Sequence, residues 1–579
     1  MIFKRNNSDQ LPLLSSRSLA FRFNFDIKWM IIGVIVIFLL VFQILPLLVL
    51  VFRAFFATGT FSLEPFKRVY NHSLNWDAVY NTLVTASLTM VFGIIVAFPL
   101  AWLVGRTNMY GKKFFRTLFV MTYMVPPYVG AMAWLRLLNP RVGNLNVFLQ
   151  NLFSLDSTPF NIYSIGGLVW VLTSFYYPFA FITISRAMER MDPSLEEASR
   201  ISGASPFKTL TTITLPMMAP SIVAAALLVF VAAASCYGIP SIIGAPGRVH
   251  TITTRIVDIT LIGTQEGLID ATTLAIFLMV VANLVLFVST FIVGRKQYIT
   301  VSGKSTRPTI VDLGRWRIVF TILVTVFALI IVLMPFATVA MTSVTVNMGR
   351  PLSLDNFTFR FWERIFTRRA IVQSGWNSLI SASIAATVGM VISCAMAYLL
   401  VRTNVKGRRI PDFLITMGSG TPSVVIALAL VMTNALVAVR FGFSLSNTLA
   451  ILVIAYMIKY LLMGMRTVVS AMSQIHPSLE EAAQISGAGW LRLLKDVTIP
   501  LILPSVVAGW FLIFMPSFYE LTMSTLLHGT NTKTLGYELY TYQTYHSQQT
   551  ASALATAILG LVVIVNLVLN KLTKGNFSI

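Results

Sequence analysis

The amino-acid sequence predicts an all-α polytopic membrane protein with about 12 transmembrane helices in two parallel six-helix repeats. Three observations predict this fold class. The chain of 579 residues is 56% apolar and only 11% charged, with a mean hydropathy of +0.78. Apolar runs of about 20 residues, each long enough to cross a bilayer as a helix, recur throughout. The second half of the chain also repeats motifs of the first half in the same order.

Other classes are excluded by the same composition. A soluble chain of this length would carry about twice this fraction of charged residues, and a membrane barrel would show short alternating strands. A net charge of +22 would suggest nucleic acid for a soluble protein, but cytoplasmic loops of membrane proteins collect Lys and Arg. The two cysteines, Cys236 and Cys394, lie far apart in apolar segments and predict neither a disulfide nor a metal site.

The apolar runs are the predicted spans, and the loops between them indicate their orientation. The first run, from Trp29 to Phe52, is too long for the apolar part of a cleavable signal peptide, so we expect an uncleaved first span. Of the 43 Lys and Arg, about 28 fall in one alternating set of loops and about 14 in the other, which predicts that both termini are cytoplasmic. The spans are expected near 29–52, 78–104, 114–137, 163–186, 217–243, 271–294, 316–341, 374–401, 410–438, 448–470, 503–527 and 549–571.

The repeat consists of matched motifs in one register. The segment that begins at Asn81 matches the one at Asn377, and Pro126 matches Pro422. An even number of spans per copy keeps the orientation, so the halves should run parallel about an axis along the membrane normal. The predicted organisation is a cytoplasmic arm at 1–28, a first repeat at 29–294 with a loop at 187–216, a cytoplasmic linker at 295–315, and a second repeat at 316–579 with a loop at 471–502.

The most specific repeat lies in the loops at 187–216 and 471–502. The first copy reads Asp192-Pro-Ser-Leu-Glu-Glu-Ala and the second reads His476-Pro-Ser-Leu-Glu-Glu-Ala. Proline in the first turn and an acidic pair near the amino end predict a short helix, which a glycine at 203 or 487 should end. We expect a second short helix that runs to Pro216 or Pro500, where the next span begins, and an exposed surface of small residues. An amphipathic helix resting on lipid is less compatible with this pattern, because it would favour basic and large apolar residues.

This repeated pattern resembles the signature loop of permease subunits from binding-protein-dependent ABC importers. The likeness covers both halves and implies the type I ABC importer permease fold. It implies that each loop holds a coupling helix that docks in a cytoplasmic ABC ATPase subunit, with two ATPase copies and one copy of this chain per transporter. It also implies an external solute-binding protein and a bacterial cytoplasmic (inner) membrane location. The residues that the resemblance assigns to ATPase coupling are Glu196, Glu197, Ala198, Gly203, Ala204, Glu480, Glu481, Ala482, Gly487 and Ala488.

ATP hydrolysis is expected from a separate chain. The stretch from Ser302 to Ser305 resembles the end of a phosphate-binding loop, but the position of the leading glycine is occupied by Tyr298. The permease is therefore not expected to be an enzyme or to bind a cofactor itself, and ATP and Mg²⁺ would be used by the partner ATPase.

Several residues are candidates for the substrate path. Glu520 lies late in the eleventh span and would suit a cation such as ferric iron, although a solvated or paired carboxylate is an equal alternative. Lys459 lies in the middle of the tenth span, where it would favour an anion if it faces the path, or its charge could instead reach the interface. Tyr237 and Tyr519 are matched hydroxyls that could line the path or pack in the core. In the outer loops, Arg248, Arg255 and Lys533 are candidate contacts for the binding protein.

The substrate stays open at this point. Fused permeases of this size look most like those of the ferric iron and thiamine group, which makes ferric iron the first expectation and a small phosphorylated or other anionic solute the second. An ion-coupled secondary transporter would need more intramembrane charges than this sequence contains. A membrane-embedded enzyme would need a cluster of His, Asp or Glu in the spans, and the five His are scattered in loops.

Overall fold

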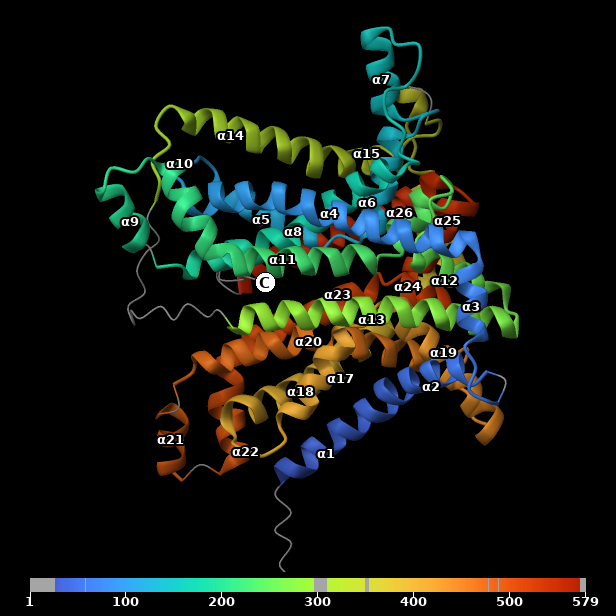
Figure 1. Ribbon diagram of the computed structural model, residues 1–579, viewed down its shortest axis with the longest axis vertical. Coiled ribbons are helices and arrows are strands. Elements are labelled where there is room, and N and C mark those ends of the chain that lie inside the picture. Colours follow the sequence, from blue (N-terminus) through green and yellow to red (C-terminus); the bar gives the residue numbers. More distant parts are fainter. Residues whose placement is uncertain are drawn as a thin grey trace, which may run out of the picture.

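The computed structural model describes residues 27–295 and 310–572, apart from Thr58, Pro193, 349–352, Pro477 and Ala488. In this part of the chain, eleven helices are long and apolar enough to cross a membrane, or up to twelve if one bent pair counts as a single span. Most of them run in broadly the same direction (Figure 1). The predicted all-helical membrane fold is therefore confirmed. The predicted arm at 1–28 and most of the linker at 295–315 fall outside the described residues.

The first half runs from α1 to α13. Its elements are α1 (Ile27–Leu39), η1 (Leu40–Ile44), α2 (Leu45–Phe55), α3 (Glu64–Asn71), α4 (Ser73–Arg106), α5 (Lys112–Tyr123), α6 (Pro127–Leu138), α7 (Asn144–Phe153), α8 (Ile165–Arg190), α9 (Ser194–Ile201), α10 (Pro206–Thr209), η2 (Leu210–Thr214), α11 (Leu215–Ala234), η3 (Pro240–Gly244), α12 (Ile252–Ile262) and α13 (Gln265–Arg295).

The second half runs from α14 to α26. Its elements are α14 (Trp316–Phe327), η4 (Ala328–Leu333), α15 (Met334–Thr342), η5 (Leu354–Asn356), α16 (Arg360–Thr367), α17 (Arg369–Arg402), α18 (Arg409–Gly420), α19 (Ser423–Phe441), α20 (Leu449–Gln474), α21 (Ser478–Ile485), α22 (Trp490–Leu493), η6 (Leu494–Thr498), α23 (Ile499–Phe518), α24 (Thr522–Leu527), α25 (Leu535–Tyr545) and α26 (Gln548–Leu572).

Each half is built around three packed helices, which are α4, α8 and α11 in the first half and α17, α20 and α23 in the second. Small residues let these helices approach closely, as is common between helices in lipid. A Cβ added at Gly93 of α4 would lie 3.3 Å from Val229 of α11, and one added at Gly389 of α17 would lie 3.3 Å from Ile513 of α23. The two halves therefore use the same close packing at matched positions.

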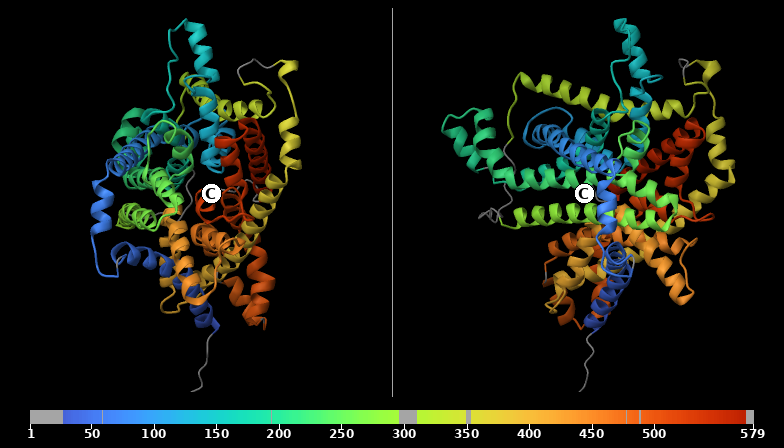
Figure 2. Two further views of the ribbon diagram at one scale, coloured as in Figure 1. Left: turned by 90° about the vertical axis from the view of Figure 1, so that its right-hand side faces the viewer. Right: turned by 45° about the vertical axis from the view of Figure 1, so that its right-hand side comes forward.

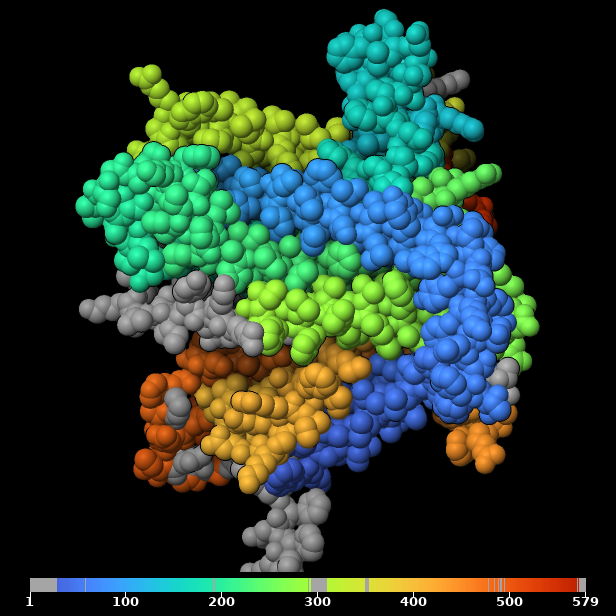
Figure 3. All heavy atoms as spheres, viewed as in Figure 1, coloured from blue at the N-terminus to red at the C-terminus, as the bar shows by residue number. Residues whose placement is uncertain are grey.

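The first span of each half packs on the opposite half. Helices α1 and α2 contact α17, α18 and α19, whereas α15 contacts α6 and the adjoining η4 contacts α5. The Gln43 amide donates a hydrogen bond of 2.7 Å to the Leu414 carbonyl, and the rings of Phe119 and Phe327 lie 5.9 Å apart. In the space-filling view the dark-blue α1 and α2 lie on the orange second half, and the yellow-green α14 lies on the first half (Figure 3). The predicted boundaries at 29–294 and 316–579 describe the order of the repeats along the chain, but each bundle in space includes a span of the other repeat.

Two predicted spans are broken in the structure. The span expected at 114–137 consists of α5 and α6, which meet at a bend of 103° directly after Pro126. The span expected at 410–438 is interrupted in the same way at Pro422, between α18 and α19. Proline has no backbone N–H to continue the helical hydrogen bonds, and it disfavours a helical conformation of the residue before it. The expectation of continuous helices at these two places is therefore corrected.

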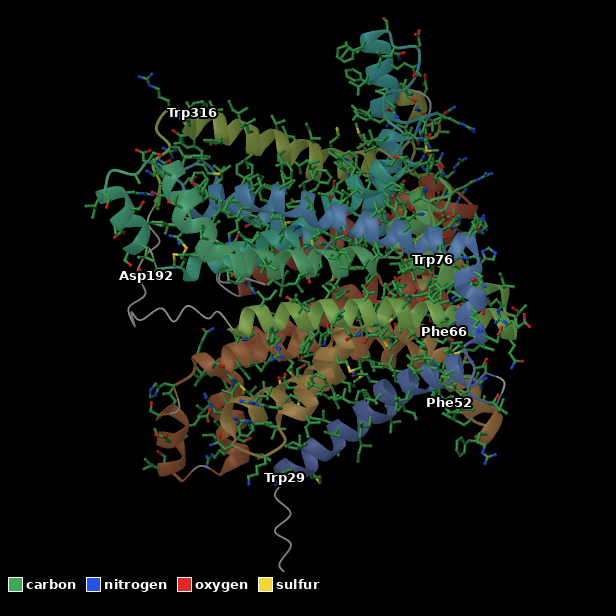
Figure 4. The ribbon with its side chains drawn as sticks, in the orientation of Figure 1. Trp29, Phe52, Phe66, Trp76, Asp192 and Trp316 are labelled. Carbon is green, nitrogen blue, oxygen red and sulfur yellow. The ribbon has the colours of Figure 1, made fainter. Side chains whose placement is uncertain are left out.

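Aromatic side chains mark the two ends of the bundle. Trp29 and Trp316 lie at one end and Phe52 and Trp76 at the other (Figure 4). Trp29, Trp76 and Trp316 are at least half exposed, as expected for side chains at the two membrane interfaces. Asp192, which precedes α9, lies at the Trp29 and Trp316 end. Both α9 and α21 lie at this end, as parallel repeats require, and α7 lies toward the opposite end (Figure 1). In both views of Figure 2 the teal α7 projects beyond the rest of the bundle at the top of the picture.

Candidate functional site

The two loop helices α9 and α21 have the same local structure. Before α9, the Asp192 carboxylate accepts a hydrogen bond of 2.9 Å from the Ser194 N–H, and before α21 the His476 ring accepts one of 3.3 Å from the Ser478 N–H. Both helices end at a glycine with a φ of +84°, a left-handed conformation that disfavours other residues. His476 thus caps its helix as Asp192 does, although its side chain is a weaker cap by type.

The second helix of each loop is continuous with the following span. Residues Pro206–Ala234 form one helical rod in which the π-helical turn η2 joins α10 to α11. In the second half, the π-helical η6 joins α22 to α23 in the same way. We expected a separate short helix that ended at Pro216 or Pro500. This expectation was wrong, because a π-turn widens the hydrogen-bonding pattern and accommodates a residue that lacks an N–H.

The loop helices expose matched apolar side chains. Ile201 and Ile485 are both 88% exposed, and Leu195 and Leu479 are both 50% exposed. Six of the predicted coupling residues are exposed beside them, namely Glu197, Ala198, Gly203, Glu481, Ala482 and Gly487. Ala204 is half-buried, and Ala488 lies outside the described residues. Large apolar side chains that are exposed outside the spans are typical of surfaces that bind another protein.

The first glutamate of each Glu-Glu motif is buried. Glu196 is 4% exposed and Glu480 is 8% exposed. Glu196 accepts a hydrogen bond of 2.7 Å from the Thr214 hydroxyl and forms an ion pair of 3.5 Å with Arg106, and Glu480 pairs with Arg402 at 2.8 Å. In each Glu-Glu motif the first carboxylate therefore points into the protein and only the second is exposed. The expectation that Glu196 and Glu480 face a partner is corrected, because each lies against an arginine of its own chain.

A cavity of about 1140 Å³ lies between the halves. All four predicted path residues line it, namely Lys459, Tyr237, Tyr519 and Glu520, together with residues of α5, α8, α11, α13 and α18. Arg408 and Arg409, at the start of α18, line the same cavity. The cavity therefore extends from the loop preceding α18 to the residues that follow α11 and α23.

Lys459 binds the carbonyl groups that the break at Pro422 leaves free. Its ammonium group lies 2.8 Å from the carbonyl oxygens of both Ser419 and Thr421. These carbonyls end α18, where a helix favours positive charge. The location of Lys459 on the cavity wall is thus explained by helix capping, and its charge does not reach the membrane interface as an alternative reading of the sequence suggested.

Glu520, which also lines the cavity, accepts hydrogen bonds from backbone N–H groups. Its Oε2 accepts hydrogen bonds of 2.8 Å and 3.0 Å from the N–H groups of Met523 and Ser524, in the first turn of α24. The side chain is 5% exposed and lines the cavity. The second half therefore contributes both Lys459 and Glu520 to the cavity wall, in addition to Arg408, Arg409 and Asp412. The first half has Gly238 where the second half has Glu520.

Tyr519 connects the halves. Its hydroxyl donates a hydrogen bond of 2.9 Å to the carbonyl of Met124, next to the break at Pro126, and its own carbonyl accepts one of 3.0 Å from the Tyr128 hydroxyl. Tyr237 instead lies near Tyr540, with ring centroids 6.3 Å apart. Sequence reasoning missed Tyr128 and the free carbonyls, although the matched prolines indicated where the carbonyls would be.

The three candidate contacts for the binding protein in the outer loops differ in their exposure and in their hydrogen bonds. Arg248 is exposed, with a φ of +58°. Arg255 donates a hydrogen bond of 2.8 Å to Asn75, and Lys533 is half-buried. Of the three, Arg248 therefore fits best a contact for another protein, because its side chain is exposed and Lys533 is half-buried.

The matched asparagines anchor the outer loops. Asn81 donates to the carbonyl of His250 at 3.0 Å, and Asn377 donates to the carbonyl of Lys533 at 2.9 Å. Beside them, burial raises the pKa of the Asp258 carboxyl, which lies 3.7 Å from the His250 ring. The described residues include no group of three His, Cys, Asp or Glu that could hold a metal ion.

Comparison with known proteins gives a family and several relatives. The model of the family described as "Binding-protein-dependent transport system inner membrane component" matches residues 93–297 and 389–575. A putative ferric transport system permease protein of Haemophilus influenzae is 25% identical over 528 residues, which cover 89% of this chain and 80% of the relative. A ferric transport system permease protein of Actinobacillus pleuropneumoniae is 24% identical and covers 82% of this chain and 68% of its own.

Shorter relatives and solved structures align with part of the chain. A spermidine/putrescine transport system permease protein of Haemophilus influenzae is 25% identical over 38% of this chain and 85% of its own length. A chain from the crystal structure of a bacterial ABC transporter that imports alginate is 19% identical, with a TM-score of 0.36, and covers 44% of this chain and 95% of that chain.

Proposed function

Because this chain belongs to the family of inner membrane components of binding-protein-dependent transport systems, we propose that it forms the solute pathway of an ATP-driven importer of ferric iron. Membership makes the chain a permease subunit of an ABC importer, and the family model matches both halves. A secondary transporter or a membrane-embedded enzyme is not compatible with this membership. We further propose its cargo, its two kinds of partner, namely an ATPase and an external binding protein, and its orientation in the membrane.

The observation that carries the coupling proposal is the matched exposed surface of α9 and α21. Two such helices on one face of the bundle fit two copies of a cytoplasmic ATPase subunit. Ile201 and Ile485, each 88% exposed, would enter an apolar cleft on each subunit, and Glu197 and Glu481 would pair with basic groups there. The charge distribution of the loops supports a cytoplasmic location for this face and for both termini.

The helical continuity of the loops supports a mechanism. ATP binding would draw the two ATPase subunits together and move α9 and α21 toward each other. Since α10 continues through η2 into α11, and α22 through η6 into α23, a displaced loop would move these spans as rods. Tyr519 follows α23 directly and Tyr237 lies three residues after the end of α11. The movement would therefore change the contact between the halves and open the cavity to the external binding protein.

Ferric iron is supported by the relatives and by the cavity wall. Two long relatives are named ferric transport system permeases. The wall supplies a carboxylate at Glu520 and phenol groups at Tyr519 and Tyr237, and oxygen donors of this kind suit a hard cation. Lys459 on the same wall favours a small anionic or phosphorylated solute, which remains the second candidate.

Reconstitution tests the proposal. The purified chain, its ATPase and its binding protein would be placed in proteoliposomes, and uptake of radioactive iron would be measured with ATP, without ATP, and with an ion gradient alone. We expect uptake only with ATP and an active ATPase. Uptake driven by the gradient without the ATPase would overturn the proposal. Uptake of a phosphorylated solute in place of iron would overturn the cargo assignment alone.

A further inference from the structure

We propose that Arg106 and Arg402 are positioning residues that fasten each loop helix to the ends of the neighbouring spans. This inference rests on the proposed function, because it concerns how force from an ATPase would reach the solute pathway. It assigns separate roles to the two carboxylates of each Glu-Glu motif: the first holds the loop helix to the membrane bundle, and the second faces the partner.

Arg106 joins four elements in the first half. It is the last residue of α4 and is only 1% exposed. One guanidinium nitrogen donates a hydrogen bond of 2.6 Å to the Met188 carbonyl near the end of α8, and another lies 3.5 Å from Glu196 of α9. The same carboxylate accepts a hydrogen bond of 2.7 Å from Thr214, which precedes α11.

Arg402 occupies the same place in the second half. It is the last residue of α17. Its Nε donates a hydrogen bond of 2.8 Å to Glu480 of α21, and its Nη2 donates hydrogen bonds of 3.1 Å and 2.8 Å to the carbonyls of Met472 and Ile475, at the end of α20. The planar guanidinium can bind a carboxylate and two carbonyls at once, which an ammonium group cannot do with the same geometry.

The two halves hold the same groups in two hydrogen-bonding arrangements. In the first half the carboxylate is bonded to Thr214, and its arginine lies 3.5 Å away. In the second half the carboxylate is bonded directly to Arg402 at 2.8 Å, and the buried hydroxyl of the matched Thr498 has no hydrogen-bond partner among the described residues. In the first half the carboxylate is therefore held by a direct hydrogen bond from Thr214 and an ion pair with Arg106, and in the second half by a direct hydrogen bond from Arg402.

This attachment explains why the pair is buried and charged. A buried charge that loses its partner is strongly unfavourable, so α9 and α21 cannot move away from the bundle without a large cost. Each helix has only eight residues. Without the buried pair, the turn at its glycine would be its main connection to the bundle. Because Arg106 and Glu196 connect α9 to these elements, a displacement of the exposed face of α9 would move the ends of α4, α8 and α11 together.

The test uses the complete transporter with its ATPase and binding protein. The variants are Arg402→Met, Arg402→Lys and Glu480→Gln, and the control is Arg369→Met, an exposed arginine at the opposite end of the same helix. Three quantities are measured: ATPase co-purified with the permease, ATP hydrolysed, and solute taken up. We expect normal co-purification and at least a tenfold fall in solute per ATP for Arg402→Met and Glu480→Gln. Arg402→Lys should recover part of the ratio, and the control should match the wild type.

A second pair of variants keeps the inference testable if Arg402→Met does not fold. Thr214→Val removes a hydroxyl bonded to Glu196, whereas Thr498→Val removes a hydroxyl without such a bond. We expect Thr214→Val to take up less solute per ATP hydrolysed than Thr498→Val. Wild-type ratios in all folded variants would overturn the inference, and so would loss of ATPase co-purification by folded variants, which would assign these residues to docking. Failure of the wild type to take up solute with ATP would instead overturn the proposed function.

Discussion

The hydroxyl of Tyr519 donates a hydrogen bond of 2.9 Å to the carbonyl of Met124, across the boundary between the two halves. Tyr519 directly follows α23, the span that continues from α22, and Met124 is the first residue of the break between α5 and α6. This hydrogen bond therefore connects α23, which the ATPase would move, with a carbonyl group that the break between α5 and α6 leaves free. Its place on the cavity wall makes it a contact that must change when the cavity opens.

We predict that Tyr519→Phe weakens the closed contact between the halves. Removing the hydroxyl leaves the Met124 carbonyl without its donor, which costs about 1–3 kcal/mol for a buried group. We expect ATP hydrolysis in the absence of binding protein to rise several-fold, measured in detergent or nanodiscs. Tyr537→Phe, at a tyrosine outside the cavity, is the control. An unchanged basal rate would show that this bond does not hold the closed state.

We predict that Lys459→Met destabilises the fold. The substitution keeps the length of the side chain but leaves the carbonyls of Ser419 and Thr421 without a donor, at a cost of about 2–5 kcal/mol in total. The thermal unfolding midpoint of the purified protein, followed by tryptophan fluorescence, should fall by several degrees. Lys571→Met, at an exposed lysine near the end of α26, should leave the midpoint unchanged. Equal midpoints for the two variants would contradict a capping role for Lys459.

We predict that Glu520→Gln reduces iron uptake more than it reduces stability. Glutamine keeps an oxygen that can accept from the N–H groups of Met523 and Ser524, so the first turn of α24 should persist, but the negative charge is lost. We expect at least a tenfold lower rate of iron uptake by proteoliposomes. Glu538→Gln is the matched control, because Glu538 is also buried, at 6% exposed, but does not line the cavity. Equal uptake by both variants would remove Glu520 from the path.

We predict that a charge on the exposed loop helices blocks binding of the ATPase. Ile201→Glu and Ile485→Glu together place charges at positions that are 88% exposed, where they do not disturb the core but would oppose an apolar cleft. Co-purification of the ATPase should fall at least tenfold. Leu354→Glu, at a leucine that is 95% exposed elsewhere on the chain, should have no effect. Normal recovery of the ATPase with the double variant would place the docking surface elsewhere.

We predict that Phe119→Cys and Phe327→Cys form a cross-link in a background without Cys236 and Cys394. The ring centroids lie 5.9 Å apart, within reach of a short bifunctional thiol reagent. Mass spectrometry of the digested protein should detect the linked peptides. Phe119→Cys with Phe52→Cys, at the far end of the bundle (Figure 4), is the negative control. Failure to link 119 with 327 would contradict the packing of the seventh span on the first half.

The number of spans, the duplication and the loop motif could all be predicted because they are local features of the chain. Hydrophobic length decides which segments cross a membrane, and repeated order decides which segments correspond. The third and ninth spans were expected to be continuous, and only the structure showed that they break beside the matched prolines at 126 and 422. The four path candidates were chosen as polar residues in apolar surroundings, a choice that needs no knowledge of packing.

The tertiary structure decided which partner each of these residues has. Nothing in the order of the residues shows that α1 packs on the second half, that Glu196 faces Arg106 while Glu197 is exposed, or that Lys459 binds the carbonyls of Ser419 and Thr421. These outcomes depend on contacts between segments that are far apart in the chain. By itself, the sequence determined the helices, their repetition and the exposed loops, because hydrophobicity and motif order act over short stretches. The assignment of buried charges came from packing, because a charge in a low-dielectric interior is stable only beside the group that satisfies it.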